Sequence, residues 1–485
     1  MKLLVHLAPV LGLALFSPFA RVTAQKYAFA HVVVGNTAAH TQDTWAQDIA
    51  LARSVGLDAF VLNIAYPDAN IYPQVAHAFA AAEAAGAGFK LFFAFDYLGG
   101  GARWPSTGER SVVSYLNLYK TSPAYFLYHG VPFVSTFEGT GDIDAWAPGG
   151  VIRSAVGGLW FVPDWTSLGP SGFAQHLDHV EGAFNWDMVS APSRRALRSP
   201  PLAGAWETLR HGISSQAMGG HFEKKAILTP TPRKWPVGAS NITTDLDHAW
   251  TDVLGSKSYM MGISPWFFHS ADSPKKWVWR GDDSWALRWK QAIDFGAPFL
   301  QIVTWNDWGE SSYIGPLRSS NEIPNGSAIY VDGQSHESWL DFLPYYIASY
   351  KGSPLPIARD QMQYWYRPAP AAAGSTCGVV GGDSSQDGVP EVSPNDILAD
   401  RIFFSALLTS AAQVHVQVGG AAETVYEFAA GLTHASQAFA GQTGVLRFWV
   451  TRDGVVAGSG NGSEITAATT LAGGCTNYNP WVGSW

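Results

Sequence analysis

Eight short apolar segments that alternate with helix-like stretches constrain the fold of this chain more than any other feature. They are YAFAHVVV (27–34), AFVLNIA (59–65), KLFFAFDY (90–97), PFVSTFEG (132–139), LWFVPDW (159–165), GAFNWD (182–187), SYMMGISPWFF (258–268) and FLQIVTWND (299–307). Buried strands that alternate with helices in this number are typical of a (β/α)8 TIM barrel. We therefore predict an α/β fold with such a barrel over residues 25–362. A doubly wound open sheet is the alternative, but no Gly-rich phosphate loop follows the first segment.

The composition changes near residue 366. The stretch RPAPAAAGST is rich in Pro, Ala and Gly, so we predict a linker over 363–375. The later stretches QVHVQV, TVYEF and VLRFWVTRDGVVAG alternate apolar and polar residues, which predicts antiparallel strands with a turn at Asp453-Gly454. We therefore predict a smaller all-β domain, a β-sandwich, over 376–485.

Within the predicted barrel, the connection 188–257 is unusually long, which favours a functional loop or an insertion.

The N-terminus has the features of a secretory signal peptide. Lys2 precedes the apolar stretch LLVHLAPVLGLALF, and small residues follow, so we predict a signal peptide over 1–24 with cleavage after Ala24 or Ala20. A membrane anchor is the competing interpretation, but the apolar run is too short and is interrupted by a proline and a histidine. We expect the protein to be secreted and either extracellular or associated with a cell wall, with no membrane partner.

The cysteine content fits an oxidising compartment. Cys377 and Cys475 are the only two cysteines, and we predict that they form one disulfide that closes the C-terminal domain. This usage does not support a zinc site. Acceptor sequons for N-linked glycans begin at Asn241, Asn325 and Asn461.

Charge and aromatic content narrow the class of partner. The 485 residues include 30 Lys+Arg and 39 Asp+Glu, and a net charge of -9 disfavours nucleic acid and anionic lipid. The 21 Trp, 18 Tyr and 26 Phe exceed ordinary usage. Sugar rings pack on indoles, so a neutral polysaccharide is one natural partner, although burial in a large core also accounts for many aromatic rings. We expect a monomer.

Polar side chains recur at the predicted carboxyl ends of the barrel strands, where the chemistry of such barrels is located. A single polar residue there is more often a helix cap or a loop contact, but the recurrence favours a site. The residues at the strand ends are His31, Asn63, Asp96, Glu138, Asp164, Asp187 and Trp266. We expect them to bind substrate together with Trp186, Asp282, Asp283, Trp305, Asn306, Trp308 and Tyr313.

The last strand segment runs into TWNDWGES, which contains two carboxylates, Asp307 and Glu310. A glycosidic bond is cleaved by two carboxyl groups, one protonated and one ionised. The indoles of Trp305 and Trp308 can desolvate one of them and raise its pKa. D-x-x-E also matches a capping box, so a purely structural role for the pair stays open. The chain has no G-x-S-x-G, H-E-x-x-H or P-loop motif.

Several motifs form a specific combination when they are taken in order. YAFAHVVVGNT, GLDAFVLNIA, FAFDY, TFEG and FVPDW are followed by NITTDLDHAW, SYMMGISPWFF, KKWVWRGDDSWALRW and TWNDWGESSYIGPL. From about Tyr27 to Leu317 the chain thus resembles the fungal α-1,3-glucanases (mutanases) of glycoside hydrolase family 71. The resemblance implies a barrel followed by a β-sandwich, and hydrolysis of α-1,3-glucan with inversion and without a metal or organic cofactor. It places the acidic pair on Asp307 and Glu310, and a related family with a W-N-E-x-x-E motif implies Glu310 as the acid and Asp307 as the base.

The chain also departs from the family pattern. Val32 and Val33 follow His31 where Phe-Met is expected, NWDMVS lacks the aromatic residue that the family pattern has at the end of strand six, and the stretch 190–230 is longer than typical. These changes concern subsites rather than the acids. Two alternatives stay open: a glucan-binding cell-wall protein that cuts no bond, and a glycosidase for another linkage, because fold and acids do not encode linkage.

Overall fold

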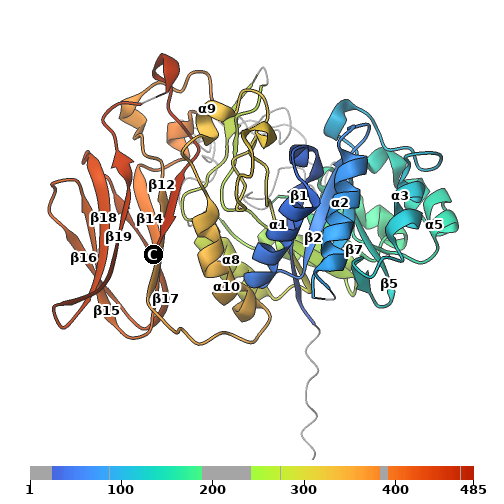
Figure 1. Ribbon diagram of the computed structural model, residues 1–485, viewed down its shortest axis with the longest axis horizontal. Coiled ribbons are helices and arrows are strands. Elements are labelled where there is room, and N and C mark those ends of the chain that lie inside the picture. The colour runs from blue at the N-terminus through green and yellow to red at the C-terminus, as the bar shows by residue number, and fades with distance from the viewer. Residues whose placement is uncertain (1–24, 87, 188–241, 273–274, 383–390, 470) are drawn as a thin grey trace, which may run out of the picture.

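The computed structural model describes residues 25–86, 88–187, 242–272, 275–382, 391–469 and 471–485. An α/β part, blue to yellow in Figure 1, lies beside an all-β part in orange and red. The predicted signal peptide, the sequon at Asn241 and the long stretch 190–230 lie outside the described residues.

A curled, mostly parallel sheet forms the centre of the α/β part. Its order is β4-β5-β3-β2-β1-β11-β8-β7, with β6 paired to β5. The bounds are β1 (Tyr27–Val33), β2 (Ala59–Ala65), β3 (Lys90–Asp96), β4 (Leu127–Tyr128), β5 (Val131–Phe137), β6 (Trp160–Phe161), β7 (Gly182–Asn185), β8 (Ser258–Ile263) and β11 (Phe299–Ile302). Each predicted segment overlaps one of these strands, and only the short β4 pairs in an antiparallel manner.

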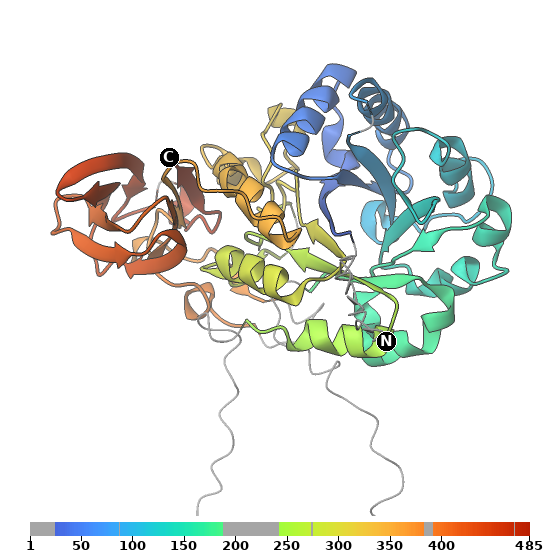
Figure 2. The ribbon, with the colours of Figure 1, turned by 90° about the horizontal axis from the view of Figure 1, so that it is seen from below.

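Helices cover the outside of this sheet, as Figure 2 shows. The principal ones are α1 (Gln42–Ser54), α2 (Ile71–Ala84), α3 (Val112–Tyr119), α5 (Val151–Val156), α6 (Gly169–Phe173), α7 (Asp245–Leu254), α8 (Ser284–Phe295) and α10 (Leu343–Tyr350). Thr41 caps α1 by accepting a hydrogen bond from the Thr44 amide, and Gly56 follows its end at φ 94°. A β-branched residue would be strained there, so a glycine suits this position.

The inside of the curled sheet is filled with phenyl rings near the amino ends of the strands. The Phe29 ring centroid lies 5.0 Å from that of Phe92 and 6.0 Å from that of Phe299. Because side chains alternate along a strand, His31 and Gln301 point the same way two residues further on. The strand interiors therefore change from apolar to polar at their carboxyl ends, and this change locates the candidate site.

Strands β5, β6 and β7 are joined by a short parallel ladder and by single β-bridges. β6 pairs with β5 in parallel, and single bridges join Phe137 to Asp164 and Asp164 to Phe184. The Asp164 amide donates to the Thr136 carbonyl at 3.2 Å, and the Phe184 amide donates to the Pro163 carbonyl at 2.9 Å.

The C-terminal part consists of two four-stranded antiparallel sheets, ordered β17-β14-β12-β20 and β16-β15-β18-β19. The bounds are β12 (Gln361–Tyr366), β14 (Arg401–Leu408), β15 (Ala412–Val418), β16 (Thr424–Phe428), β17 (Gly431–Ala438), β18 (Gly444–Arg452), β19 (Val455–Ile465) and β20 (Trp481–Ser484). The buried residues between the sheets include Met362, Tyr364, Ile402, Phe404, Val414, Val416, Phe448 and Val450. The predicted turn at Asp453-Gly454 joins β18 to β19.

The boundary between the two parts differs from the sequence prediction. Residues 361–366, expected to end the barrel and begin a linker, form β12, which pairs with both β14 and β20. Their sequence QMQYWY has strand propensity, and the Pro/Ala/Gly composition starts only after it. A small sheet also crosses the boundary, because β13 (Val380–Gly381) pairs with β10 (Trp277–Val278), which pairs with β9 (Phe268–His269).

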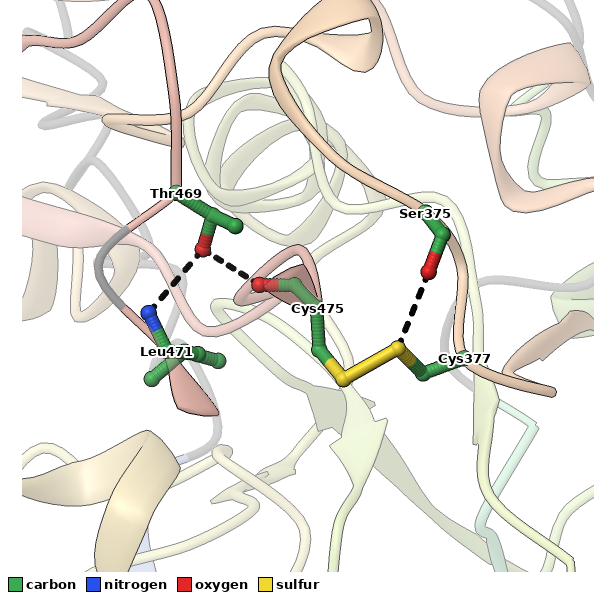
Figure 3. The surroundings of a disulfide bond; sticks show 5 residues. All are labelled: Ser375, Cys377, Thr469, Leu471 and Cys475. Atoms are coloured by element: carbon green, nitrogen blue, oxygen red, sulfur yellow. Dashed lines mark hydrogen bonds between the residues drawn. A yellow bond between two sulfur atoms is a disulfide. The ribbon is translucent and has the colours of Figure 1, made fainter. Parts of the chain in front are cut away.

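The two parts share one buried cluster, besides the separate core between the two C-terminal sheets. The Trp339 and Trp365 rings lie 4.7 Å apart, and both belong to the same cluster as the strands of the curled sheet. The predicted disulfide joins Cys377 to Cys475 and is confirmed (Figure 3). Beside it, the Leu471 amide donates to the Thr469 hydroxyl at 3.2 Å.

Two further observations concern the surface. The sequon asparagines Asn325 and Asn461 are exposed. Among the residues that the structure describes, no helix has the length and apolar character needed to span a membrane.

Candidate active site

The loop that follows β11 carries the acidic pair. We call residues 304–314 the acid loop. It is closed on itself, because the Thr304 amide donates to the Ser312 carbonyl at 2.9 Å and the Ile314 amide donates to the Thr304 carbonyl at 3.1 Å. The Thr304 hydroxyl also accepts a hydrogen bond from the Asp307 amide at 2.8 Å. The backbone geometry of the loop thus fixes where Asp307 leaves the chain.

Asp307 and Glu310 lie on one tight turn of the acid loop. Asp307 Oδ1 accepts a hydrogen bond from the Glu310 amide at 3.0 Å. This contact matches half of the capping interpretation, but the next helical segment of the chain begins only at Ser320. The Glu310 side chain is 29% exposed, and its Oε1 lies 3.9 Å from His269 Nδ1. The pair therefore caps a turn and not a helix, and its Glu310 carboxyl reaches the surface.

Three carboxylates influence one another at this point. Burial raises the pKa of Asp307 well above its usual value, and the negative charges of Glu310 and Asp96 raise it further. Burial also raises the pKa of Asp96, although the amides of Gly99 and Leu98 donate to it at 2.6 and 2.9 Å and oppose the shift. Because anions repel each other in a poorly solvated site, the protonated form of Asp307 is favoured.

Neutral polar groups flank these acids on the neighbouring strands. Asn63 Nδ2 donates to Asp96 Oδ2 at 3.3 Å. His31 Nδ1 lies 3.0 Å from Gln301 Nε2, and burial lowers the pKa of His31 to about 3, so its ring is neutral. The ring centroids of His31 and Trp186 are 5.0 Å apart in an edge contact. The ends of β1, β2, β3 and β11 thus carry two pairs of hydrogen-bonded polar side chains, which are largely buried.

A second group of acids follows β5, β6 and β7. The Ser167 amide donates to Glu138 Oε1 at 2.9 Å, and the Thr166 hydroxyl donates to Asp164. Burial raises the pKa of Asp164 well above its usual value, and the charges of Glu138 and Asp187 add to the effect. Burial likewise raises the pKa of Glu138. Predicted residues from three separate strands therefore meet in this second group.

Trp266, Asp282 and Asp283 lie at the contact with the C-terminal part. Trp266 is buried and its Nε1 donates to the Tyr478 carbonyl at 2.8 Å. The Asp282 carboxylate accepts from the Ala399 amide at 3.3 Å, and Asp283 pairs with a buried arginine on the same turn. Long-range partners that the local sequence does not reveal thus occupy the polar atoms of Trp266 and Asp282, and a neighbour on the same turn pairs with Asp283.

The aromatic residues of the acid loop are also buried. Trp305, Trp308 and Tyr313 are at most 2% exposed. Their rings therefore pack inside the protein and support the acid loop, and they expose no ring face on which a sugar could stack. Asn306 is held by the backbone of Val33, to which it donates at 3.0 Å and from which it accepts at 2.8 Å. These four residues, which we expected to touch substrate, join the acid loop to the rest of the fold.

Sequence reasoning missed four residues that contact the predicted acids or His31. They are Thr166, Ser167, His269 and Gln301. Only Gln301 carried a usable signal, because a glutamine inside the apolar run FLQI of a buried strand requires a partner. Within the described ranges, no cluster of three or more His, Cys, Asp or Glu side chains could hold a metal ion.

Carboxyl groups with raised pKa values at the carboxyl ends of parallel strands fit the acid chemistry that a glycoside hydrolase needs. Comparison with known proteins agrees with this class. The sequence profile of glycosyl hydrolase family 71 matches residues 24–193 and 232–485, and the chain therefore belongs to that family. The unmatched residues 194–231 fall almost entirely within the stretch that is longer than typical.

Two relatives with nearly full-length similarity come from fungi. A mutanase of Penicillium rubens is 30% identical over 100% of this chain and 94% of its own length. A glucan endo-1,3-alpha-glucosidase of Schizosaccharomyces pombe is 28% identical over 97% of both chains. Among solved structures, a GH99 endo-alpha-mannosidase of Bacteroides thetaiotaomicron superposes with a TM-score of 0.44 at 13% identity, covering 68% of this chain and 99% of that one.

Proposed function

We propose that this glycoside hydrolase cleaves α-1,3-glucosidic bonds of α-1,3-glucan with inversion, using Asp307 and Glu310 as the acid and base pair. The observation that carries the proposal is the single turn that holds both carboxyls, with the pKa of Asp307 raised by burial and by the charge of Glu310. Protonating the leaving oxygen and activating water require one protonated and one ionised carboxyl. The names of the two fungal relatives support α-1,3-glucan as the substrate.

The division of roles within the pair is a separate part of the proposal. The family resemblance assigns the acid to Glu310 and the base to Asp307, whereas the raised pKa of Asp307 favours the protonated form of Asp307. We assign the acid to Glu310, because its carboxyl is the one that reaches the surface, and propose that substrate binding transfers the proton within the pair. A glucosyl fluoride substrate, which needs no acid, tests this: it should rescue Glu310→Gln and not Asp307→Asn.

Further parts of the proposal concern the fold and the setting. The parallel pairings of β5 with β6, of β7 with β8 and of β11 with β1, with the bridges at Asp164, support closure of the strands into a (β/α)8 barrel. We also propose that the chain is a secreted monomer. Its substrate-binding residues would be His31, Asn63, Asp96, Glu138, Asp164, Trp186 and Asp187.

The deciding experiment offers the enzyme α-1,3-, α-1,4- and β-1,3-glucans and follows product release by NMR. We expect products from α-1,3-glucan alone, released first as the β-anomer. Products of α configuration would contradict inversion, and cleavage of another glucan would contradict the proposed linkage. Binding to α-1,3-glucan without sugar release would support the glucan-binding protein instead.

A further inference from the structure

The acid loop depends on a neighbouring segment for part of its backbone support. The Phe268 amide donates to the Glu310 carbonyl, and the Ser270 amide donates to the Gly309 carbonyl, both at 2.8 Å. Phe268 belongs to β9, which lies outside the central sheet. The position of the Glu310 backbone therefore depends on what holds β9.

β9 is held by the C-terminal part of the chain. Val278 of β10 pairs with Phe268 on one side and with Gly381 of β13 on the other. The Gly382 amide extends this contact by donating to the Val278 carbonyl at 3.0 Å. An unbroken series of backbone pairings therefore runs from residues 380–382 to Glu310.

A second connection reaches the other end of the acid loop. Asn479 Nδ2 donates to the Tyr313 hydroxyl at 2.9 Å and to the Tyr330 carbonyl at 3.1 Å. The two ring nitrogens of His336 each lie 3.0 Å from a carbonyl oxygen, one of Tyr313 and one of Pro480. The His336 ring also stacks on Tyr313 at 4.0 Å with an interplanar angle of 12°.

One covalent bond links the two connections. The disulfide Cys377–Cys475 joins the chain just before β13 to the chain just before residues 477–480, and Ser375 forms a backbone bridge to Cys475. We call residues 377–381 and 475–480 the C-terminal clamp. It contacts the acid loop at Tyr313 and, through β10 and β9, at Glu310.

We propose that the C-terminal clamp positions Asp307 and Glu310 for reaction, and that Asn479 is a positioning residue. This inference rests on the function proposed above. Asn479 is fully buried, and its amide provides the Tyr313 hydroxyl with its donor. Without that amide, Tyr313 retains its own hydrogen bond to the Gln334 carbonyl but loses its tie to the clamp. Small displacements of catalytic groups reduce turnover strongly, by about 100-fold for 1 Å.

The test compares Asn479→Ala with Tyr366→Phe as a matched control. Tyr366 is equally buried in the C-terminal part and its hydroxyl donates to the Ser463 carbonyl at 2.6 Å, but it belongs to the separate core between the two sheets. Asn479→Ala should lower kcat on α-1,3-glucan about 10- to 100-fold with KM changed by less than about twofold. Tyr366→Phe should lower the melting temperature and leave kcat unchanged.

Hydrogen exchange supplies a readout that does not depend on activity. Peptides that cover residues 304–314 should exchange faster in Asn479→Ala than in the wild type, and unchanged in Tyr366→Phe. Should Asn479→Ala fail to fold, Tyr313→Phe removes the same hydrogen bond while keeping the ring, and it should lower kcat in the same direction.

Two results would overturn the inference: unchanged kcat and exchange in a folded Asn479→Ala, or kcat losses in both variants that simply follow their melting temperatures. A wild type that releases no sugar from α-1,3-glucan would refute the proposed function, and the exchange comparison would still decide whether the clamp holds the acid loop.

Discussion

Asp307 and Glu310 differ in how firmly they are held. Asp307 is fixed by hydrogen bonds at its amide and at one carboxyl oxygen, whereas Glu310 extends to the surface. We expect Asp307→Asn and Glu310→Gln each to lower kcat about 100- to 10,000-fold on α-1,3-glucan, because each removes a proton-transfer group. Release of reducing ends measures the loss, and circular dichroism checks the fold. Glu427→Gln, an exposed carboxyl on β16, serves as the control and should retain full activity.

Asp282 makes stability depend on pH. Burial raises its pKa to about 7, against the attraction of Arg280, so the folded protein retains a proton that the unfolded chain releases near pH 4. The folded state therefore binds more protons between about pH 4 and 7, and the free energy of unfolding falls as pH rises through that window.

Asp282→Asn should remove this dependence, because asparagine keeps an oxygen for the Ala399 amide and never ionises. Relative to the wild type, the variant should gain up to about 4 kcal/mol at pH 8 and nothing at pH 4, from about 1.4 kcal/mol per pKa unit. Urea unfolding at the two pH values measures the difference. Equal gains at both values would contradict an ionisation effect.

At the scale of elements, a buried ion pair attaches two helices to β8. Arg288 of α8 forms two hydrogen bonds of 2.7 Å with Asp247 of α7, and Tyr259 of β8 donates to the same carboxylate at 2.8 Å. Arg288→Met should reduce the free energy of unfolding by about 3 to 5 kcal/mol, because it leaves Asp247 charged and buried. The exposed pair Lys290–Asp294 lies on the same helix, so Lys290→Met is the control and should cost less than about 0.5 kcal/mol.

At the scale of the whole molecule, the shared core couples the strands of the curled sheet to the C-terminal sheets. Trp365 of β12 packs on Trp339 and donates to the Asp282 carbonyl at 2.5 Å. We therefore expect one cooperative transition in calorimetry, since neither part can expose this contact without losing buried aromatic area. Two separate transitions, with the C-terminal sheets melting independently, would show that the parts fold as independent domains.

Much of the fold follows from local patterns. The apolar runs predict the parallel strands, because a strand that is buried on both faces has apolar residues throughout. Alternation predicts β15, β16 and β18, because a strand that is buried on one face alternates apolar and polar residues. The spacing of Asp307 and Glu310 likewise brought both acids to one turn. The predicted linker begins too early, because QMQYWY has strand propensity and pairs with β14, and the Pro/Ala/Gly composition starts only after it.

The sequence by itself determined which segments become strands, which residues end them and which two cysteines pair, since each of these depends on neighbours along the chain or on a single possible partner. Only the tertiary structure decided which of the predicted site residues lie near Asp307 and Glu310. Trp266 and Asp282 looked like site residues, yet Trp266 bonds to a carbonyl 212 positions away and Asp282 to an amide 117 positions away. The apolar pattern of a segment indicates which of its residues are buried. It does not indicate which distant backbone group forms hydrogen bonds with them.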